Sequence, residues 1–466
     1  MSRLAAHSVR SRIGAAARPR VTGRVSHVVG LRIEVEGLHA AVGDAVWVRR
    51  EDDSRLLTEV VAVRGHHLAC LPLGEPAGVR YGDEAEAAGR PFALTVGPGL
   101  LGRVLDGLGQ PLDDGPPLVG DEQVGIDVAP PHPLRREMVD RPISLGIRAI
   151  DTAVPCGRGQ RVGIFAGSGV GKSSLLSMIA RGTDAQVSVV TLIGERGREV
   201  SEFIRRDLKD ALERSVVVVA TSDQPALVRI RAAFTGTRIA EWFRDEGKDV
   251  VLMMDSLTRF AMAQREVGLS AGEPPATRGY PPSVFSLLAK LLERAGAAER
   301  GSITGLYTVL VEGDDMNEPI ADAARSILDG HIVLSRRLAT AGHFPSIDVL
   351  ESISRVEPAI TTDAQRALAR ELRQLLAAYR EAKELIETGF YAPGSNPVVD
   401  RAIELKPYID AFLRQDVEET FDPATSWGCL GALLAPAGGS LPPPSAAGEP
   451  ARDDDSRATR LLTGAR

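Results

Sequence analysis

A glycine-rich segment, Ala-Gly-Ser-Gly-Val-Gly-Lys-Ser at residues 166–173, lies between an apolar run and a helical pattern. This arrangement is typical of a phosphate-binding loop, because glycines let backbone N–H groups turn inward around phosphate oxygens. The lysine of such a loop reaches the β- and γ-phosphates, and the hydroxyl after it can ligate Mg²⁺. The alternative is a glycine-rich turn without a ligand. We predict an ATP and Mg²⁺ site with these nucleotide-binding residues: Gly167, Ser168, Gly169, Val170, Gly171, Lys172, Ser173 and Ser174.

A carboxylate that could serve the metal follows the apolar run 250–254, where Asp255 is the next residue. An acid at the tip of a buried strand can hold the water shell of Mg²⁺ beside the loop hydroxyl. Any strand can end in Asp, so Asp255 indicates a metal site only because a phosphate-binding loop precedes it in the chain. We predict that Ser173 and Asp255 hold the metal.

Hydrolysis also needs a base that orients water and a cation that meets the charge of the transition state. The apolar run 187–193 leads into Glu195 and Arg196, and Glu195 is the predicted base, with Arg196 beside it as a catalytic cation. The alternative for Glu195 is a carboxylate at a helix N-terminus, a role that Glu199 fits better. A second segment, residues 348–356, contains Arg355, which its spacing alone would make an ordinary surface arginine.

The elements that must position these side chains are apolar, β-branched runs at residues 161–166, 187–193, 215–221 and 250–254. Helical patterns at residues 198–212 and 226–245 alternate with them. Continuous apolar strands alternating with helices predict a parallel sheet with helices on both faces. Ligands gather at the carboxyl ends of the strands in such sheets, which is where the predicted site residues fall.

The domain organisation follows from changes in composition along the chain, and the predicted fold class is multidomain α/β. Short apolar runs broken by glycine and charge predict an N-terminal β-barrel, and residues 97–133, dense in Gly, Pro and Asp, read as turns and a linker. A run rich in Ala, Leu, Glu and Arg opens a C-terminal helical domain. The predicted units are a disordered basic arm (1–20), the β-barrel (21–95), the nucleotide-binding domain with the parallel sheet (96–361), the helical domain (362–434) and a disordered tail (435–466).

Bulk properties exclude several classes of protein. The formal net charge of −7 disfavours nucleic acid as a partner, because phosphate recognition usually requires a basic domain. The chain has no secretory signal and no apolar stretch of about 18 residues, so we expect a cytoplasmic protein. The arginine-rich start could contact a membrane surface or a partner protein.

Several segments together resemble the type III secretion ATPases, which are relatives of the catalytic subunit of rotary ATP synthases. They are GRVLDGLGQPLD from Gly102, DRPISLGIRAIDTAVPCGRGQRVGIFAGSGVGKSSLL at residues 140–176, EPPATRGYPPSVF at 273–285 and LLERAG at 291–296. The segment at 273–285 resembles the secretion branch more than the synthase branch. The resemblance spans roughly residues 21–434 and leaves the tail unexplained.

The resemblance implies that residues 96–361 form a RecA-like ATPase domain. It further implies a homohexameric ring in which Arg355 acts in trans as an arginine finger on a neighbour's γ-phosphate. It also implies that Phe344, where the family often has Tyr, stacks on adenine. The implied partners are a central stalk, peripheral stator or regulator proteins, and chaperone–effector complexes at the cytoplasmic face of the inner membrane. Export would then use ATP hydrolysis to release chaperones and help unfold secreted effectors.

The motif Asp-Asp-Met-Asn-Glu-Pro at residues 314–319 resembles the injectisome branch of this family, which we favour over the flagellar branch. Three other functions remain as alternatives. They are a flagellar export ATPase, the catalytic subunit of a rotary proton-translocating ATPase, and a nucleotide regulator that does not hydrolyse. The segment at 273–285 argues against the synthase subunit. Glu195 together with Lys172 and Ser173 argues against the regulator.

Overall fold

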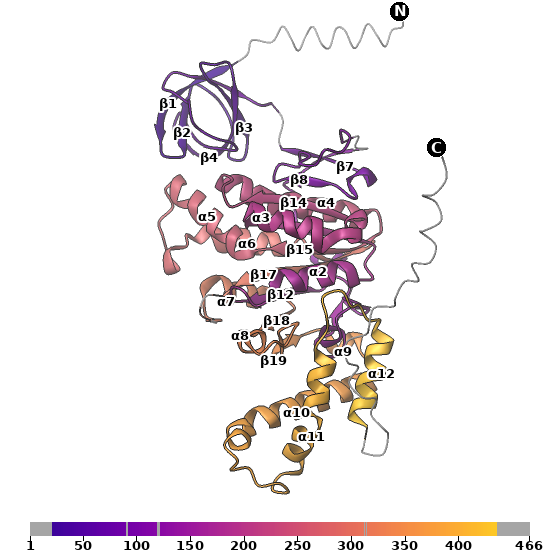
Figure 1. The fold of residues 1–466 in the computed structure, drawn as a ribbon. Coiled ribbons are helices and arrows are strands. Elements are labelled where there is room, and N and C mark those ends of the chain that lie inside the picture. The colour runs from indigo at the N-terminus through magenta and orange to yellow at the C-terminus, as the bar shows by residue number, and fades with distance from the viewer. Residues whose placement is uncertain (1–20, 90–91, 119–121, 312, 314, 436–466) are drawn as a thin grey trace, which may run out of the picture.

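The N-terminal part of the chain is a closed six-stranded barrel in the order β1-β2-β5-β4-β3-β6 (Figure 1). Its strands are β1 (Thr22–Val29), β2 (Arg32–Glu36), β3 (Ala45–Arg49), β4 (Arg55–Arg64), β5 (His67–Pro72) and β6 (Glu84–Ala87). Alternate side chains such as Val46 and Val48 are buried inside it, as period-2 strands require. The barrel ends before the expected boundary at 95, because β7 (Ala93–Val96) pairs with β9 (Glu122–Gly125) instead.

This computed structural model describes residues 21–89, 92–118, 122–311, 313 and 315–435. The predicted basic arm (1–20) and residues 436–466 of the predicted tail lie outside the described residues, as does Asp314 of the injectisome-like motif.

The central sheet has nine strands, and its main path runs β19-β18-β12-β17-β15-β13-β14-β8. The strands are β8 (Val104–Asp106), β12 (Arg161–Ala166), β13 (Val187–Glu195), β14 (Ser215–Thr221), β15 (Asp249–Asp255), β17 (Ser302–Leu310), β18 (Gly330–Leu334) and β19 (Ile347–Ser354), with β16 (Gly296–Ala297) paired to β17. The four predicted strands are all present and parallel to their neighbours. The predicted fold class is therefore confirmed.

Two details of the sheet correct the sequence prediction. The stretch 97–133 is not only turns and linker, because β8 lies within it and extends the sheet beside β14. The sheet is also not purely parallel, because the edge strand β19 runs antiparallel to β18. An antiparallel edge strand is common on otherwise parallel sheets, and sequence periodicity gives no information on strand direction.

Helices cover both faces of the sheet, and successive residues of a strand point into different cores. On β14, Val216 and Val218 belong to one core, and Val217 and Val219 belong to the other. The helices of the ATPase domain are α2 (Lys172–Gly182), α3 (Gly197–Glu202), α4 (Ala226–Asp245), α5 (Leu257–Ala271), α6 (Pro282–Leu292), α7 (Pro319–Ile327), α8 (Arg336–Thr340) and α9 (Glu357–Ile360). Strands buried on both faces explain why their sequences are continuous apolar runs.

The helix predicted at residues 198–212 is wrong beyond its first part. After α3 the chain forms a π-helical turn (Phe203–Leu208) and a 3-10 turn (Lys209–Arg214). Lys209 adopts a φ of 39°, which a regular helix does not permit, and Arg181 donates a 2.7 Å hydrogen bond to the carbonyl of Asp207. The periodic pattern was present, but these tertiary contacts override it.

The C-terminal domain consists of α10 (Asp363–Glu387), α11 (Pro397–Leu413) and α12 (Pro423–Leu434). Thr362 and Gln365 form a capping box that fixes the start of α10. Buried side chains of these helices, among them Leu372 and Phe412, join the same core as one face of the sheet. None of the helices in the described ranges has the length and hydropathy that a membrane span requires.

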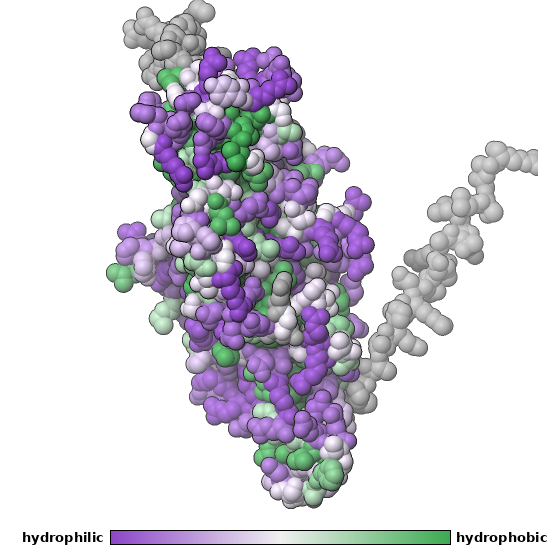
Figure 2. Space-filling view, turned by 90° about the vertical axis from the view of Figure 1, so that its left-hand side faces the viewer, coloured by the Kyte–Doolittle hydropathy of each residue, from purple (hydrophilic) through white to green (hydrophobic). Residues whose placement is uncertain are grey.

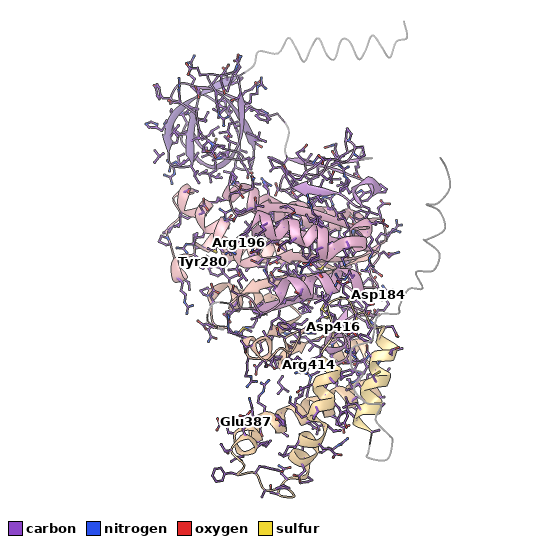
Figure 3. The ribbon with its side chains drawn as sticks, in the orientation of Figure 1. Asp184, Arg196, Tyr280, Glu387, Arg414 and Asp416 are labelled. Carbon is purple, nitrogen blue, oxygen red and sulfur yellow. The ribbon has the colours of Figure 1, made fainter. Side chains whose placement is uncertain are left out.

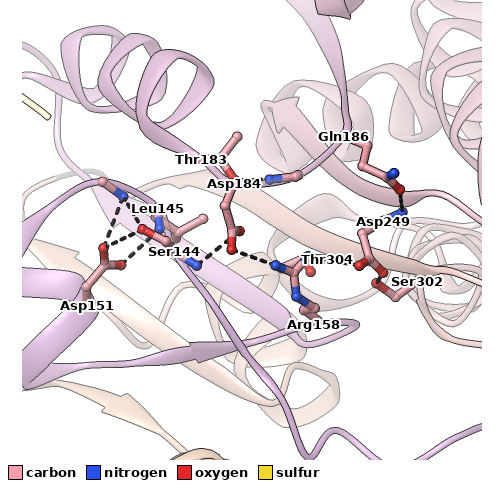
Figure 4. A network of polar contacts seen from close by, with 12 residues as sticks. Ser144, Leu145, Asp151, Arg158, Thr183, Asp184, Gln186, Asp249, Ser302 and Thr304 are labelled. Atoms are coloured by element: carbon pink, nitrogen blue, oxygen red, sulfur yellow. Dashed lines mark hydrogen bonds and ion pairs between the residues drawn. The ribbon is translucent and has the colours of Figure 1, made fainter. Parts of the chain in front are cut away.

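A polar network closes the amino-terminal edge of the sheet, away from the phosphate-binding loop (Figure 4). Arg158 donates to Asp184 at 2.6 Å and to Asp249 at 2.9 Å, and Asp249 also accepts from Ser302 at 2.6 Å. These residues flank β12, β13, β15 and β17, so one guanidinium links the starts of four strands. The face of the molecule drawn in Figure 2 is mainly hydrophilic, with hydrophobic residues grouped at the end formed by the helical domain.

The deepest ion pair joins Arg294 and Glu241, whose side chains are 0% and 2% exposed. Two hydrogen bonds of 2.7 and 2.6 Å connect them, and Arg294 also donates to the carbonyl of Ile126. We expect Arg294→Met to lower the free energy of unfolding by about 3–5 kcal/mol, because it leaves a buried carboxylate without its main partner. Urea denaturation measures this. The double variant Arg294→Met/Glu241→Met should recover most of the loss, and a single variant as stable as wild type would contradict the argument.

Candidate active site

The phosphate-binding loop connects β12 to α2, and two of its glycines adopt backbone angles that other residues avoid. Gly169 has a φ of 75° and Gly171 a φ of 92°, and Gly171 is the N-cap of α2. The loop is tied to β19, because the Ser346 hydroxyl donates a 2.6 Å hydrogen bond to the carbonyl of Val170. The loop thus presents the free N–H groups of a helix N-terminus, which is a favourable place for phosphate.

Three predicted residues meet at the carboxyl edge of the sheet. The Lys172 ammonium lies 2.5 Å from Asp255 Oδ1 and 3.3 Å from Glu195 Oε1. Asp255 Oδ1 also accepts a 2.7 Å hydrogen bond from the hydroxyl of Thr308 on β17. The lysine of the loop therefore contacts both carboxylates, one predicted to hold the metal and the other predicted to activate water.

The electrostatics of this cluster favour a charged lysine and a less acidic glutamate. Burial opposes the charge of Lys172, but Asp255 and Glu195 outweigh it and raise the pKa of the ammonium. Burial, together with the charge of Asp255, raises the pKa of Glu195, although Lys172 and Arg259 act in the opposite direction. A base with a raised pKa accepts a proton more readily, which suits the predicted role of Glu195.

This raised pKa predicts an acid limb in the pH dependence of turnover. The predicted role as a base requires Glu195 to be ionised, so the rate should fall as the pH drops through a pKa above the usual value of about 4.3. When the γ-phosphate draws Lys172 away, the contribution that lowers this pKa weakens. The acid limb of kcat should therefore lie at higher pH than that of kcat/KM, since these report bound and free enzyme. Coincident acid limbs would contradict this prediction.

Two side chains, Ser173 and Asp255, offer the oxygen ligands that Mg²⁺ prefers. The hydroxyl of Ser173, in the first turn of α2, makes no hydrogen bond with any described residue, and Asp255 Oδ2 is also without one. No cluster of three or more His, Cys, Asp or Glu side chains exists in the described part of the chain to hold a metal alone. Mg²⁺ normally takes one or two protein ligands together with phosphate oxygens and water, so this sparse donor set fits.

Two arginines near Glu195 differ in position. Arg196, which was predicted as a catalytic cation and is labelled in Figure 3, has a side chain that is 76% exposed and pairs with Glu199 at 3.1 Å. Arg259 on α5 was not predicted, yet its side chain packs on Gly194, where a Cβ would lie 3.1 Å from Arg259 Cβ. One feature of the sequence could have indicated that Arg259 lies near the site: it follows Asp255 by four residues, in the first turn of the next helix.

Phe344 stands beside the loop, as predicted for an adenine-stacking ring. A Cβ built on Gly171 would lie 3.4 Å from two atoms of the Phe344 ring, which is 44% exposed. Ser168 and Ser174 are exposed, and Val170 is buried. One exposed face of the aromatic ring is thus available for stacking next to the phosphate-binding loop.

Arg355 lies at the opposite end of the sheet from the loop of its own chain. Its backbone N–H donates to the carbonyl of Asp329, whose own N–H donates to Arg161 at the start of β12. The loop follows the other end of this six-residue strand, roughly 20 Å away at ~3.3 Å per residue. The structure therefore does not bring Arg355 and Lys172 of one chain together.

Comparisons with known proteins agree with this architecture. Residues 146–354 match the model of the ATP synthase alpha/beta family, nucleotide-binding domain, and residues 361–432 match the T3SS EscN ATPase C-terminal domain. The flagellum-specific ATP synthase of Bacillus subtilis is 50% identical over 400 residues, covering 85% of this chain and 91% of that protein. The type 3 secretion system ATPase of Xanthomonas euvesicatoria is 49% identical over 399 residues, covering 85% and 90%.

A solved structure shows the same fold over nearly the whole described chain. It is the assembled ATPase EscN in complex with its central stalk EscO, from the type III secretion system of enteropathogenic E. coli. Its TM-score is 0.83 at 44% identity, covering 89% of this chain and 100% of that one. Relatives of this similarity, with the two family models, confirm the predicted resemblance: the chain belongs to the family of type III secretion and flagellar export ATPases, and it is an ATP-driven enzyme of type III protein export.

Proposed function

We propose that this chain hydrolyses ATP at sites shared between neighbouring copies in a homohexameric ring. One copy supplies Lys172, Ser173, Asp255 and Glu195, and the next copy supplies Arg355. The observation that carries this proposal is the placement of Arg355 at the sheet edge opposite its own loop, where it could act only on another chain. An arginine finger supplied in trans makes hydrolysis depend on assembly.

Each residue has a separate task in the proposed reaction. Lys172 leaves Asp255 and Glu195 to contact the β- and γ-phosphates, and Glu195 then accepts the proton of the attacking water. Bound Mg²⁺, held by Ser173 and within reach of Asp255, would neutralise phosphate charge. Arg196 would join the site only by turning away from Glu199.

The helical domain is the proposed contact for a central stalk, of the kind that the EscN complex contains. Leu385, Phe390 and Val398, at the ends of α10 and α11 and in the turn between them, are 51%, 81% and 48% exposed. Exposed apolar side chains grouped in this way commonly mark protein interaction sites. Peripheral stator or regulator proteins are further proposed partners, and the assembly would sit at the cytoplasmic face of the inner membrane.

We further propose that hydrolysis releases chaperones from effectors and helps unfold them, and that the chain serves an injectisome. The Met-Asn-Glu-Pro sequence after Asp315 supports the injectisome branch, whereas the segment 273–285 separates export ATPases from the synthase subunit only. The flagellar branch is the second candidate, because flagellar relatives reach the same identity as secretion relatives. Binding of the purified ATPase to chaperone–effector complexes from the same bacterium, but not to flagellar chaperones, would favour the injectisome.

Steady-state hydrolysis of Mg-ATP against protein concentration tests the shared site. Specific activity should rise with concentration, since the complete site forms only on assembly. A mixture of Glu195→Gln and Arg355→Ala chains should regain turnover that neither variant shows alone, because some interfaces then combine an intact Glu195 with an intact Arg355. Activity that is flat with concentration, with no rescue on mixing, would overturn the proposal.

A further inference from the structure

A cavity of about 250 Å³ lies between the ATPase domain and the helical domain, next to the edge strand β19. Its walls come from α8 and β19 on one side and from α10 and α11 on the other. Leu338, Leu376 and Leu413 provide an apolar surface, and Tyr379 adds an aromatic ring. We call this space the joint cavity. Its volume lies just below the ~300–1,000 Å³ of typical small-molecule sites, so it suits a metabolite of modest size.

Most charges that line the joint cavity are already paired. Arg380 binds Asp348 at 2.6 Å and Glu351 at 2.8 Å, and Lys406 binds Asp410 at 2.5 Å. Lys383 pairs with Glu387 at 3.4 Å. Because their charges are neutralised by these carboxylates, Arg380, Lys383 and Lys406 contribute little to the attraction of an anion.

Two guanidinium groups on opposite walls are not paired. Arg337 on α8 and Arg414 at the end of α11 line the cavity, and neither side chain has a hydrogen bond or ion pair with a described residue. Arg414 marks the joint between the two domains in Figure 3. Both side chains are exposed to solvent as well as lining the cavity, and two always-charged donors from different walls can together contact a doubly charged anion.

A buried imidazole adds a third polar group without a partner. His343 is 4% exposed, lines the same cavity, and its ring has no hydrogen-bond partner among the described residues. Burial lowers its pKa, the charges of Arg414 and Lys406 act in the same direction, and Asp410 opposes them. The ring is therefore neutral near pH 7 and offers an N–H donor. A neutral imidazole that lines the cavity can donate one hydrogen bond to an anion bound there.

We propose that the joint cavity is a second ligand site, separate from the nucleotide site, that takes a small phosphomonoester. Its phosphate, with a charge of about −1.5 to −2 at pH 7, would contact Arg337 and Arg414 together, and His343 would donate a hydrogen bond. Its apolar part would lie against Leu413 and Tyr379. A ligand that touches both walls fixes the helical domain against β19 and so adjusts the position of a strand that touches the nucleotide site.

Isothermal titration of the full chain with phenyl phosphate tests this, with saturating Mg-ADP present so that the nucleotide site is filled. We expect saturable binding, and weaker binding by benzyl alcohol, which lacks the anion. Arg337→Gln and Arg414→Gln should each weaken the affinity by about 10–100-fold, the usual effect of losing a hydrogen bond to a charged group. Inorganic phosphate should bind more weakly than phenyl phosphate because it leaves the apolar surface uncovered.

Arg336→Gln is the matched control, because Arg336 is the neighbour of Arg337 on α8 and is exposed like it, but does not line the cavity. It should bind phenyl phosphate like wild type. Three results would overturn the proposal: no saturable binding, equal loss in Arg336→Gln and Arg337→Gln, or binding of benzyl alcohol as tight as that of phenyl phosphate. Binding that disappears when Mg-ADP is added would assign the ligand to the nucleotide site and overturn it as well.

Discussion

Replacing Arg355 with alanine is expected to reduce ATP turnover by roughly 10³-fold or more, the usual effect of losing an arginine finger. The affinity for nucleotide and the thermal stability should change little. The side chain is exposed and makes a single 3.3 Å hydrogen bond to the carbonyl of Arg325, so its removal leaves no buried group without a partner. Single-turnover hydrolysis, together with binding of a fluorescent ATP analogue, separates these quantities.

The matched variant is Arg355→Lys, which keeps the charge but loses the planar fork that binds phosphate oxygens in pairs. Its turnover should lie between those of wild type and Arg355→Ala. If Arg355→Ala hydrolyses ATP as fast as wild type, Arg355 is not part of any site. If it instead loses thermal stability in proportion to activity, the arginine acts on the fold and the proposed role is wrong.

Replacing Lys172 with alanine should abolish most hydrolysis, by about 10²–10³-fold, because a cation at the γ-phosphate is lost from a preorganised site. A second effect follows from the geometry. The lysine lies between Glu195 and Asp255, whose side chains are 15% and 4% exposed, so its removal leaves two carboxylates facing each other in a nearly dry space. We therefore expect the nucleotide-free variant also to unfold at a lower temperature than wild type.

The double variant Lys172→Ala/Asp255→Asn distinguishes these two effects. Removing one negative charge should restore much of the lost stability, because the repulsion between carboxylates disappears, but it should restore no activity. Differential scanning calorimetry and a hydrolysis assay on the same samples measure both. A single variant that keeps full stability would mean that water or a bound cation already screens the carboxylates, and a double variant that hydrolyses ATP would remove Lys172 from the mechanism.

The parts of the site that the sequence predicted are those whose signals are local. The phosphate-binding loop is one continuous segment, and Glu195 and Asp255 each end an apolar strand, so the parallel sheet alone brings them to one edge. Thr308 was missed because its contact with Asp255 depends on the register of β17 beside β15, which a single strand sequence does not reveal. Arg259 was missed because its proximity to Glu195 depends on how α5 packs.

The fold shows the same division between local and long-range information. The helix α4 was predicted with its observed bounds, since twenty residues of helical pattern form it. The strand β8 is three residues long, and its partner β14 lies more than a hundred positions later, so no local pattern identified it. The proposed catalytic role of Arg355 came only from resemblance, because the spacing of residues in one chain carries no information about a site on a neighbouring chain.

The position of strand β19 has a consequence for the order in which the sites of the ring would hydrolyse ATP. Just before its start, Ser346 holds the carbonyl of Val170 and Phe344 stands over Gly171, while Arg355 follows its other end. In the proposed ring, the start of β19 would contact the nucleotide bound to its own copy. Arg355, after the end of β19, would contact the nucleotide bound to the next copy. A shift of β19 on ATP binding would move Arg355 in the neighbour's site. ATP hydrolysis would then proceed from one site to the next around the ring rather than independently at each site.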